Sequence, residues 1–245
     1  MRRLKACGKL VRALLHILIG FFTILLVFPR ISQQQREKRI QTWSLRMLEC
    51  IAVKLVVRGQ PVLNGPMLLM ANHISWLDIT SLHAARFCRL VSKADIKKWP
   101  VIGTLAVGVG TLFIERESRR DAMRVVHHMA ERLRAGDVMG VFPEGTTSDG
   151  TSLLPFHANL FQSAIEANVA VQPVALQFMD WRSGQRSAAP CYVGDDTLAE
   201  SVWRTLCSSD LAVVITYGPP QYAEGRDRRA WALALRSDIE DLRRL

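Results

Sequence analysis

Short apolar runs alternate with helix-compatible segments along most of this chain. Runs of this kind, bounded by turn formers, are typical of buried strands, and they lie at residues 53–57, 67–70, 89–92, 110–114, 138–142, 169–178 and 211–217. Helical patterns lie at residues 74–86, 118–134, 159–167 and 227–242. Strands that alternate with helices predict an α/β fold, here with a mixed, largely parallel sheet flanked by helices.

The bulk composition fits one globular domain with an attachment. A chain of 245 residues with 49% hydrophobic residues can bury one substantial core. The sequence contains no internal repeat, low-complexity tract or interdomain linker. We therefore assign residues 53–245 to a single domain and residues 1–52 to an N-terminal helical region.

The N-terminal region contains a segment that predicts a membrane anchor. Residues 13–28 read ALLHILIGFFTILLVF, and as a helix of about 24 Å they are slightly short for a perpendicular span. Basic residues precede this segment (Arg2, Arg3, Lys5, Lys9 and Arg12) and follow it (Arg30, Arg36, Lys38 and Arg39). Because positive charge flanks both sides, the positive-inside rule gives no clean orientation.

A signal peptide is the alternative interpretation of this segment. Phe28-Pro29-Arg30 offers no small-residue cleavage site, so a retained anchor is favoured. We expect the anchor to span or half-insert, with its basic flanks on anionic headgroups. His16 within it is interpreted as a tolerated polar residue, and residues 33–54 as a polar helix lying against the membrane or the domain.

The charge and cysteine content narrow the class of partner. A formal net charge of +10 favours nucleic acid, an anionic membrane surface or a phosphorylated substrate. Aromatic residues make up only 7% and are not interleaved with the basic ones, so no nucleic-acid partner is expected. Five scattered cysteines without a Cys-x-x-Cys pair indicate a reducing compartment, and no metal site is expected.

A histidine and an aspartate follow the apolar run at 67–70. His73 is expected at a strand-to-helix turn, and Asp78 lies a little over one helical turn further on, where its carboxylate can reach back to the imidazole. Such a contact fixes the tautomer and leaves the other nitrogen free to take a proton from an attacking hydroxyl. Taken alone, a turn histidine beside a helix-start aspartate explains the same spacing.

Other candidate residues stand at the ends of the predicted strands. Glu144 and Thr146 lie in a loop rich in glycine and hydroxyl residues after the run at 138–142, where strand ends meet ligands. Arg116 follows the run at 110–114, and its guanidinium can hold a phosphate with two hydrogen bonds. Lys93 follows the run at 89–92 and adds a second positive charge. Each of these is also explained as an ordinary surface residue.

Taken together and in order, these motifs resemble the glycerolipid acyltransferases, and the bacterial 1-acyl-glycerol-3-phosphate acyltransferases most of all. The four blocks are Asn72-His73-x-x-x-x-Asp78, Gly110-Thr111-Leu112-Phe113-Ile114-x-Arg116, Phe142-Pro143-Glu144-Gly145-Thr146 and Val171-Gln172-Pro173-Val174. Lys93 with Pro100 and Gly103 also looks like that family. The resemblance runs over residues 53–178, and an ordered set of this kind is highly specific.

The resemblance implies transfer of a fatty acyl group from a thioester of acyl carrier protein or coenzyme A to the free hydroxyl of a lysophospholipid. With 1-acyl-sn-glycerol-3-phosphate as the acceptor, the product is phosphatidic acid in phospholipid biosynthesis. His73 would be the general base and Asp78 its orienting carboxylate. Arg116, helped by Lys93, would hold the acceptor phosphate. The glycerol would be positioned by Glu144, Gly145 and Thr146, and no cofactor is implied.

Two departures from the family pattern leave the acceptor open. Thr147 stands where many members carry arginine, and His157 lies in a segment where lysine and glycine are common. A lyso-ornithine-lipid or other lysophospholipid acyltransferase is therefore the first alternative, and a non-catalytic membrane lipid-binding protein is the alternative of a different class. On the acyltransferase reading, residues 53–245 form the catalytic domain. The anchor would hold it at a bacterial inner membrane with the site on the cytoplasmic face.

Overall fold

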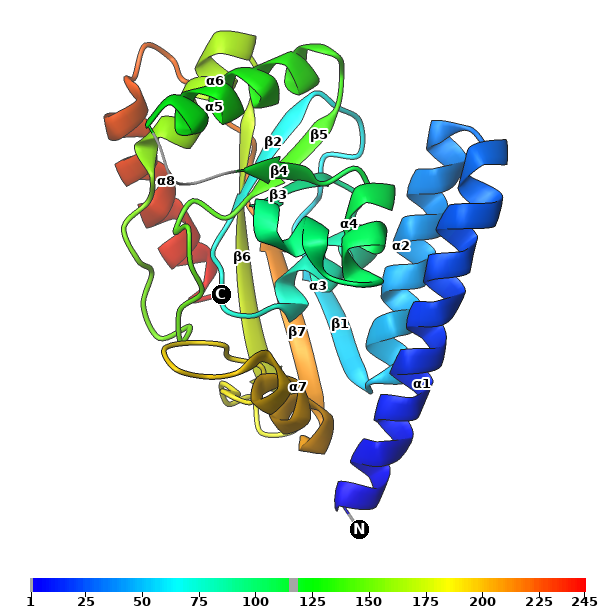
Figure 1. The fold of residues 1–245 in the computed structure, drawn as a ribbon. Coiled ribbons are helices and arrows are strands. Elements are labelled where there is room, and N and C mark those ends of the chain that lie inside the picture. Colours follow the sequence, from blue (N-terminus) through cyan, green and yellow to red (C-terminus); the bar gives the residue numbers. More distant parts are fainter. Residues whose placement is uncertain (1, 115–118) are drawn as a thin grey trace.

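The computed structural model describes residues 2–114 and 119–245, which form a layered α/β fold around one sheet (Figure 1). The sheet has seven strands in the order β1-β7-β6-β2-β5-β3-β4. Their bounds are β1 (Val53–Arg58), β2 (Met67–Ala71), β3 (Arg89–Lys93), β4 (Leu112–Ile114), β5 (Val138–Val141), β6 (Val171–Asp180) and β7 (Leu211–Tyr217). All neighbours are parallel except β6 and β7. The predicted mixed, largely parallel sheet is therefore confirmed.

Helices cover both faces of the sheet. They are α1 (Arg2–Phe22), α2 (Gln33–Cys50), α3 (Leu77–Ala85), α4 (Ile102–Gly108), α5 (Arg119–Arg134), α6 (Phe161–Ala167), α7 (Leu198–Cys207) and α8 (Arg228–Leu242). Shorter turns of helix are η1 (Thr23–Val27), η2 (Phe28–Arg30), η3 (Ala94–Lys98) and η4 (Ala158–Leu160).

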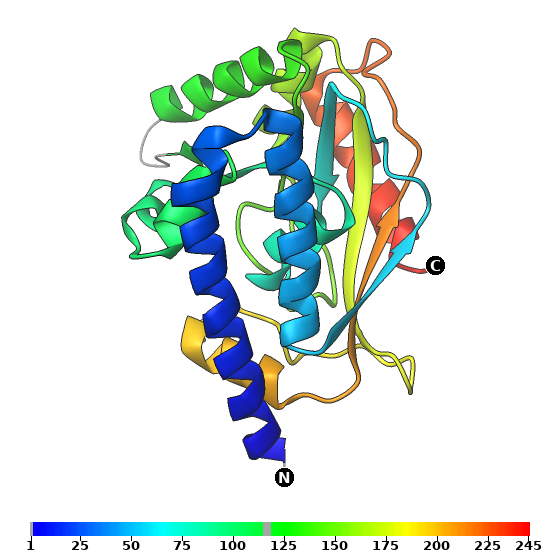
Figure 2. The ribbon, with the colours of Figure 1, turned by 90° about the vertical axis from the view of Figure 1, so that its right-hand side faces the viewer.

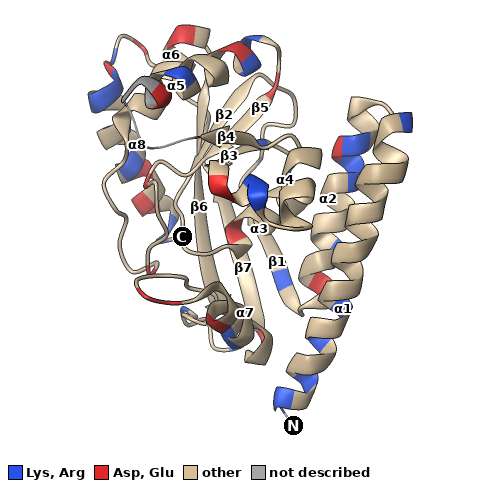
Figure 3. Cartoon of the chain, viewed as in Figure 1, with Lys and Arg blue, Asp and Glu red and all other residues tan. Residues whose placement is uncertain are grey.

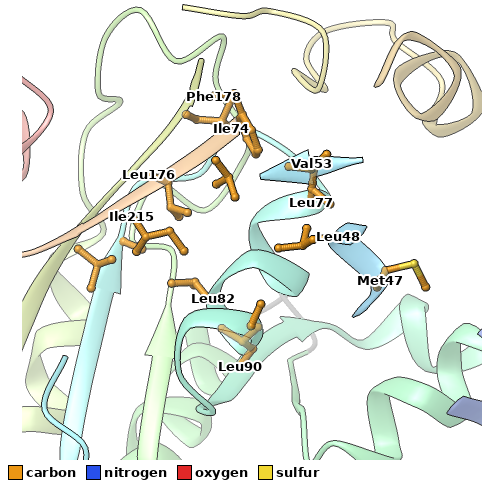
Figure 4. Packing of buried hydrophobic residues seen from close by; sticks show 14 of the residues in the cluster. Met47, Leu48, Val53, Ile74, Leu77, Leu82, Leu90, Leu176, Phe178 and Ile215 are labelled. Atoms are coloured by element: carbon orange, nitrogen blue, oxygen red, sulfur yellow. The ribbon is translucent and has the colours of Figure 1, made fainter. Parts of the chain in front are cut away.

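A hydrophobic core lies on each face. One core packs α1, α2, α3 and α7 against the sheet, and Figure 4 shows part of it around Leu48, Leu77 and Leu82. The other packs α5, α6 and α8. In β2, Leu69 joins the first core and Leu68 joins the second. Because successive strand residues point to opposite faces, a strand buried on both sides must read as a continuous apolar run.

Each apolar run in the sequence contains a strand, but the helices differ from expectation in three places. α3 begins at Leu77 because residues 73–76 form the turn that Asp78 holds. α4 was not expected, since it is short, contains glycine and lacks an amphipathic pattern. α7 was also missed, although the capping box between Thr197 and Glu200 was a signal for its start. Ser118, the first residue of the helical pattern at 118–134, lies outside the described residues.

The first two helices form an antiparallel pair on one side of the domain (Figure 2). The rings of His16 and Trp43 stack at 5.0 Å, and each side chain donates a hydrogen bond to the other's backbone carbonyl, at 2.9 and 3.0 Å. A Cβ on Gly20 would lie 2.6 Å from Trp43 Nε1, so this approach requires glycine. At the other end of α1, Lys9 donates to the carbonyl of Ser208 at 2.8 Å. His16 therefore fixes α1 to α2, a role that the sequence did not reveal.

The opposite side of α1 is apolar and exposed. The helical stretch Arg2–Arg30 is long and apolar enough to cross a membrane, judged by length and composition alone. Its exposed large side chains include Leu14, Leu18 and Phe22. Figure 3 shows basic residues near the amino terminus of α1 and near its connection to α2, with a tan stretch of uncharged residues between them. This distribution suits a helix whose apolar face meets lipid and whose ends meet headgroups.

Candidate active site

The catalytic candidates lie at one edge of the sheet. β2, β3, β4, β5 and β6 are mutually parallel, so their carboxyl ends share that edge. His73 comes two residues after β2, and Phe142 comes directly after β5. Ligand sites of open α/β sheets form at such an edge, because strand ends and their following loops converge there.

His73 and Asp78 form a hydrogen-bonded pair. His73 Nδ1 lies 2.7 Å from Asp78 Oδ2, which also accepts the backbone N–H groups of Ile74 at 2.6 Å and Ser75 at 2.9 Å. Asp78 is completely buried in the first turn of α3. Since a carboxylate only accepts, the proton resides on Nδ1 and Nε2 can accept another. One carboxylate therefore holds both the ring and the turn that carries it.

The imidazole ring of His73 stacks on Phe142. The ring centroids are 4.0 Å apart and the planes differ by 11°. This contact restricts ring rotation, and because an aromatic face favours a cation, it would stabilise a protonated imidazole. The sequence pointed to the loop that Phe142 begins but not to this contact.

Glu144 binds the backbone on either side of the site. Its Oε1 accepts the N–H of His73 at 2.7 Å, and its Oε2 accepts the N–H of Leu154 at 2.9 Å. Its side chain is 4% exposed, and burial raises the pKa of the carboxyl, while the hydrogen bonds from Leu154 and His73 oppose that rise. Both oxygens are thus already bonded to the chain. Glu144 braces the backbone of His73, and its contact with substrate stays a prediction.

Ser148 completes the hold on His73. Its backbone N–H and its hydroxyl both donate to the carbonyl oxygen of His73, at 2.8 and 3.1 Å. Together with Glu144, it fixes the N–H and the C=O of His73 from a single loop. Sequence reasoning did not identify Ser148, because nothing local to either residue indicates the pairing.

Gly145 and Thr146 lie at the surface of the same loop. Gly145 has φ +71°, a left-handed conformation that favours glycine. A Cβ there would lie 2.7 Å from His157 Nε2, so the imidazole of His157 rests on this glycine. Thr146 is exposed, whereas the hydroxyl of Thr147 donates to the carbonyl of Tyr192. His157 therefore borders the site, and the side chain of Thr147 anchors the loop that contains Tyr192.

Of the two residues predicted to bind the phosphate, the structure describes Lys93 and does not describe Arg116. Lys93 ends β3 at the same edge as His73, but its Nζ pairs with Asp95 Oδ2 at 2.6 Å and both side chains are exposed. The hydrogen bond from Lys93 lowers the pKa of Asp95. Arg116 lies outside the described residues, two positions beyond the end of β4. An anionic ligand would therefore have to compete with Asp95 for the ammonium group of Lys93.

Comparison with known proteins finds sequence relatives of this chain. The model of the Acyltransferase family matches residues 36–177. The chain is 39% identical over 193 residues to the lyso-ornithine lipid O-acyltransferase of Pseudomonas aeruginosa, covering 79% of this chain and 73% of that protein. It is 39% identical over 186 residues to the 1-acyl-sn-glycerol-3-phosphate acyltransferase of Neisseria gonorrhoeae, covering 75% and 71%.

A solved structure extends the likeness to the whole chain. The 1-acyl-sn-glycerophosphate (LPA) acyltransferase PlsC from Thermotoga maritima aligns over 99% of this chain and 98% of its own, with a TM-score of 0.67 and 19% identity. At that identity the match shows a shared fold. The extent of the family match shows that this chain belongs to the acyltransferase family. It is an acyltransferase of the kind that includes the LPA and lyso-ornithine lipid enzymes.

Proposed function

We propose that this enzyme transfers a fatty acyl group from acyl carrier protein or coenzyme A to the free hydroxyl of a lysophospholipid, with His73 as general base. The observation that carries the proposal is the 2.7 Å contact between His73 Nδ1 and the buried Asp78. It leaves Nε2 as a proton acceptor at the carboxyl edge of the sheet, where the loop after β5 fixes its backbone.

In the proposed reaction, His73 and Asp78 handle the proton that moves from the acceptor hydroxyl to the leaving thiolate. Nε2 takes the proton of the acceptor hydroxyl as its oxygen bonds to the thioester carbonyl carbon. The tetrahedral intermediate collapses, the C–S bond breaks, and the imidazolium returns the proton to the leaving thiolate. Asp78 stabilises the imidazolium in between. No acyl-enzyme is required, because the thioester is already activated and the acceptor is the nucleophile.

The proposed acceptor is 1-acyl-sn-glycerol-3-phosphate, which would make the product phosphatidic acid. Arg116 would hold the phosphate, with Lys93 contributing if it exchanges Asp95 for the ligand. Thr146 and the backbone at Gly145 would face the glycerol. Lyso-ornithine lipid is the second candidate, favoured by the name of the Pseudomonas relative, which is as similar as the Neisseria one.

We also propose that α1 lies along the bilayer surface without crossing it. Its buried positions Ala6, Lys9, Ala13, His16 and Gly20 recur at steps of three and four, and they pack on the domain along the length of the helix. A helix packed in this way cannot leave the domain to span. Residues 1–52 would thereby hold the catalytic domain, residues 53–245, at the cytoplasmic face of the inner membrane, where lysolipids need not be drawn into water.

The test is a panel of acceptors offered to the purified full-length enzyme in lipid vesicles. Lysophosphatidate, other lysophospholipids and lyso-ornithine lipid are each supplied with acyl carrier protein and coenzyme A thioesters. Acylation of lysophosphatidate that disappears in H73A supports the proposal. Acylation of lyso-ornithine lipid alone reassigns the acceptor. Equal lipid binding by H73A and wild type with no turnover of any acceptor points to the non-catalytic alternative.

A further inference from the structure

The crossover between β3 and β4 carries apolar side chains that are partly exposed. Residues 99–112 read WPVIGTLAVGVGTL, without any charged side chain. They contain α4, in which Gly103 is the one buried residue. Trp99, Ile102 and Val107 are 45%, 39% and 51% exposed. Contiguous apolar exposure of this kind marks an interaction surface.

This surface is continuous with the apolar side of α1. α4 contacts both α1 and η1, and it lies beside the same part of α1 in Figures 1 and 2. The contact with η1 is close, because a Cβ on Gly108 would lie 2.5 Å from Ile24 Cδ1. Leu25 and Leu26, next to Ile24, are exposed as well. A partner that covers the apolar side of α1 would therefore also contact α4.

The charges around this surface favour an anionic lipid layer as its partner. Lys97 and Lys98 in η3 are exposed and directly precede Trp99. Tryptophan favours the boundary between headgroups and acyl chains, and lysines beside it favour anionic headgroups. A second copy of the chain would bring its own lysines against these, which disfavours self-association through this surface.

We infer that Trp99, Ile102 and Val107 enter the bilayer beside α1, with Lys97 and Lys98 at the headgroups. This second membrane contact rests on the proposed membrane location of the enzyme. The segment that makes this contact follows β3, which ends at Lys93, and precedes β4. In the sequence, Arg116 lies two positions after the end of β4. Insertion thus fixes the phosphate-facing edge of the sheet at the depth where a lysophospholipid presents its headgroup.

Fluorescence tests the insertion without reference to catalysis. Wild type and W99F are each bound to vesicles of phosphatidylglycerol with plain or brominated acyl chains, and the difference between the two proteins isolates the emission of Trp99. We expect bromine to quench at least half of that emission. Equal emission of Trp99 in plain and brominated vesicles overturns the inference.

Kinetics tests its consequence. I102S/V107S is compared with L233S, which makes the same kind of change at a 72% exposed leucine on α8. We expect a KM for acceptor in anionic vesicles raised about fivefold or more in I102S/V107S alone, with unchanged kcat/KM in detergent micelles. An equal rise in micelles would place α4 in substrate binding and overturn the inference. Self-association of wild type that is lost in I102S/V107S, with undiminished vesicle binding, would also overturn the inference.

The two proposals fail in different ways. If no acceptor is turned over by wild type, the proposed function is wrong, while quenching of Trp99 still decides the insertion. If turnover is normal and Trp99 is not quenched, the insertion alone is wrong.

Discussion

Glu144 binds the backbone of His73, with its Oε1 accepting the histidine N–H at 2.7 Å. The contact joins residues 71 positions apart and connects the loop after β5 to the turn after β2. His73 is therefore positioned at its ring by Asp78 and Phe142, and at its backbone by Glu144 and Ser148. General-base catalysis depends on such placement, because the base must meet the hydroxyl proton within hydrogen-bond reach.

Removal of the base should abolish most of the rate while sparing the fold. H73A is expected to lower kcat by about 10²- to 10⁴-fold, the usual contribution of a positioned base. D78N should have a comparable effect, because an amide is a weaker partner for the imidazolium. Acyl transfer in vesicles and the far-ultraviolet dichroism of each variant check this. Activity of H73A within a few fold of wild type would contradict the assignment.

The brace formed by Glu144 gives a prediction that separates it from a substrate ligand. E144Q turns one of two carboxylate acceptors into a donor, which leaves a backbone N–H of His73 or Leu154 unpaired. The expected loss of unfolding free energy is about 1–3 kcal/mol. kcat should fall while KM for acceptor changes little, whereas loss of a substrate contact would raise KM. E166Q, at an exposed glutamate of α6, is the matched control.

The contact between Gly145 and His157 is open to a double-mutant cycle. G145A places a Cβ against the imidazole of His157 and imposes an alanine on φ +71°. It should destabilise the enzyme by about 1–3 kcal/mol. Adding H157A removes the steric part and should restore part of the loss, as thermal unfolding would report. Strictly additive effects would show that the two side chains do not meet.

Burial of His83 predicts an acid-sensitive stability. Burial lowers the pKa of His83 from 6.5 to about 4, partly opposed by its hydrogen bond to the carbonyl of Cys88. Because the folded pKa is depressed, the stability from neutral His83 is complete above pH 6.5 and is lost as pH falls toward 4. The difference amounts to about 3 kcal/mol. Urea unfolding of H83Q and of wild type across this pH range should show the difference.

The packing of α1 can be tested with two glycines of the same helix. G20V would drive a side chain into Trp43, whereas Gly8 has no neighbouring atom within 4 Å of its added Cβ. We expect G20V to cost about 1–3 kcal/mol and to speed hydrogen exchange in α1. G8V should do neither. Equal exchange in both variants would show that α1 is not held by α2.

The sequence by itself determined the layers of the fold and the half of the site that is local. Short apolar runs bounded by turn formers predict strands, and the fully buried β2 and β7 show this pattern most clearly. His73 and Asp78 are five residues apart, and that distance is set by one turn and the start of a helix. Such features depend on backbone geometry that neighbouring residues impose on each other.

Only the tertiary structure decided what holds the histidine and which surfaces remain uncovered. The position of Glu144 after a strand predicts a contact with substrate, but its contacts with His73 and Leu154 exist because β5 lies beside β2. Ser148, the pairing of His16 with Trp43 and the exposure of α4 carry no periodic or spacing signal. Contacts between distant residues are set by how strands and helices pack, and a single chain read from end to end does not contain that arrangement.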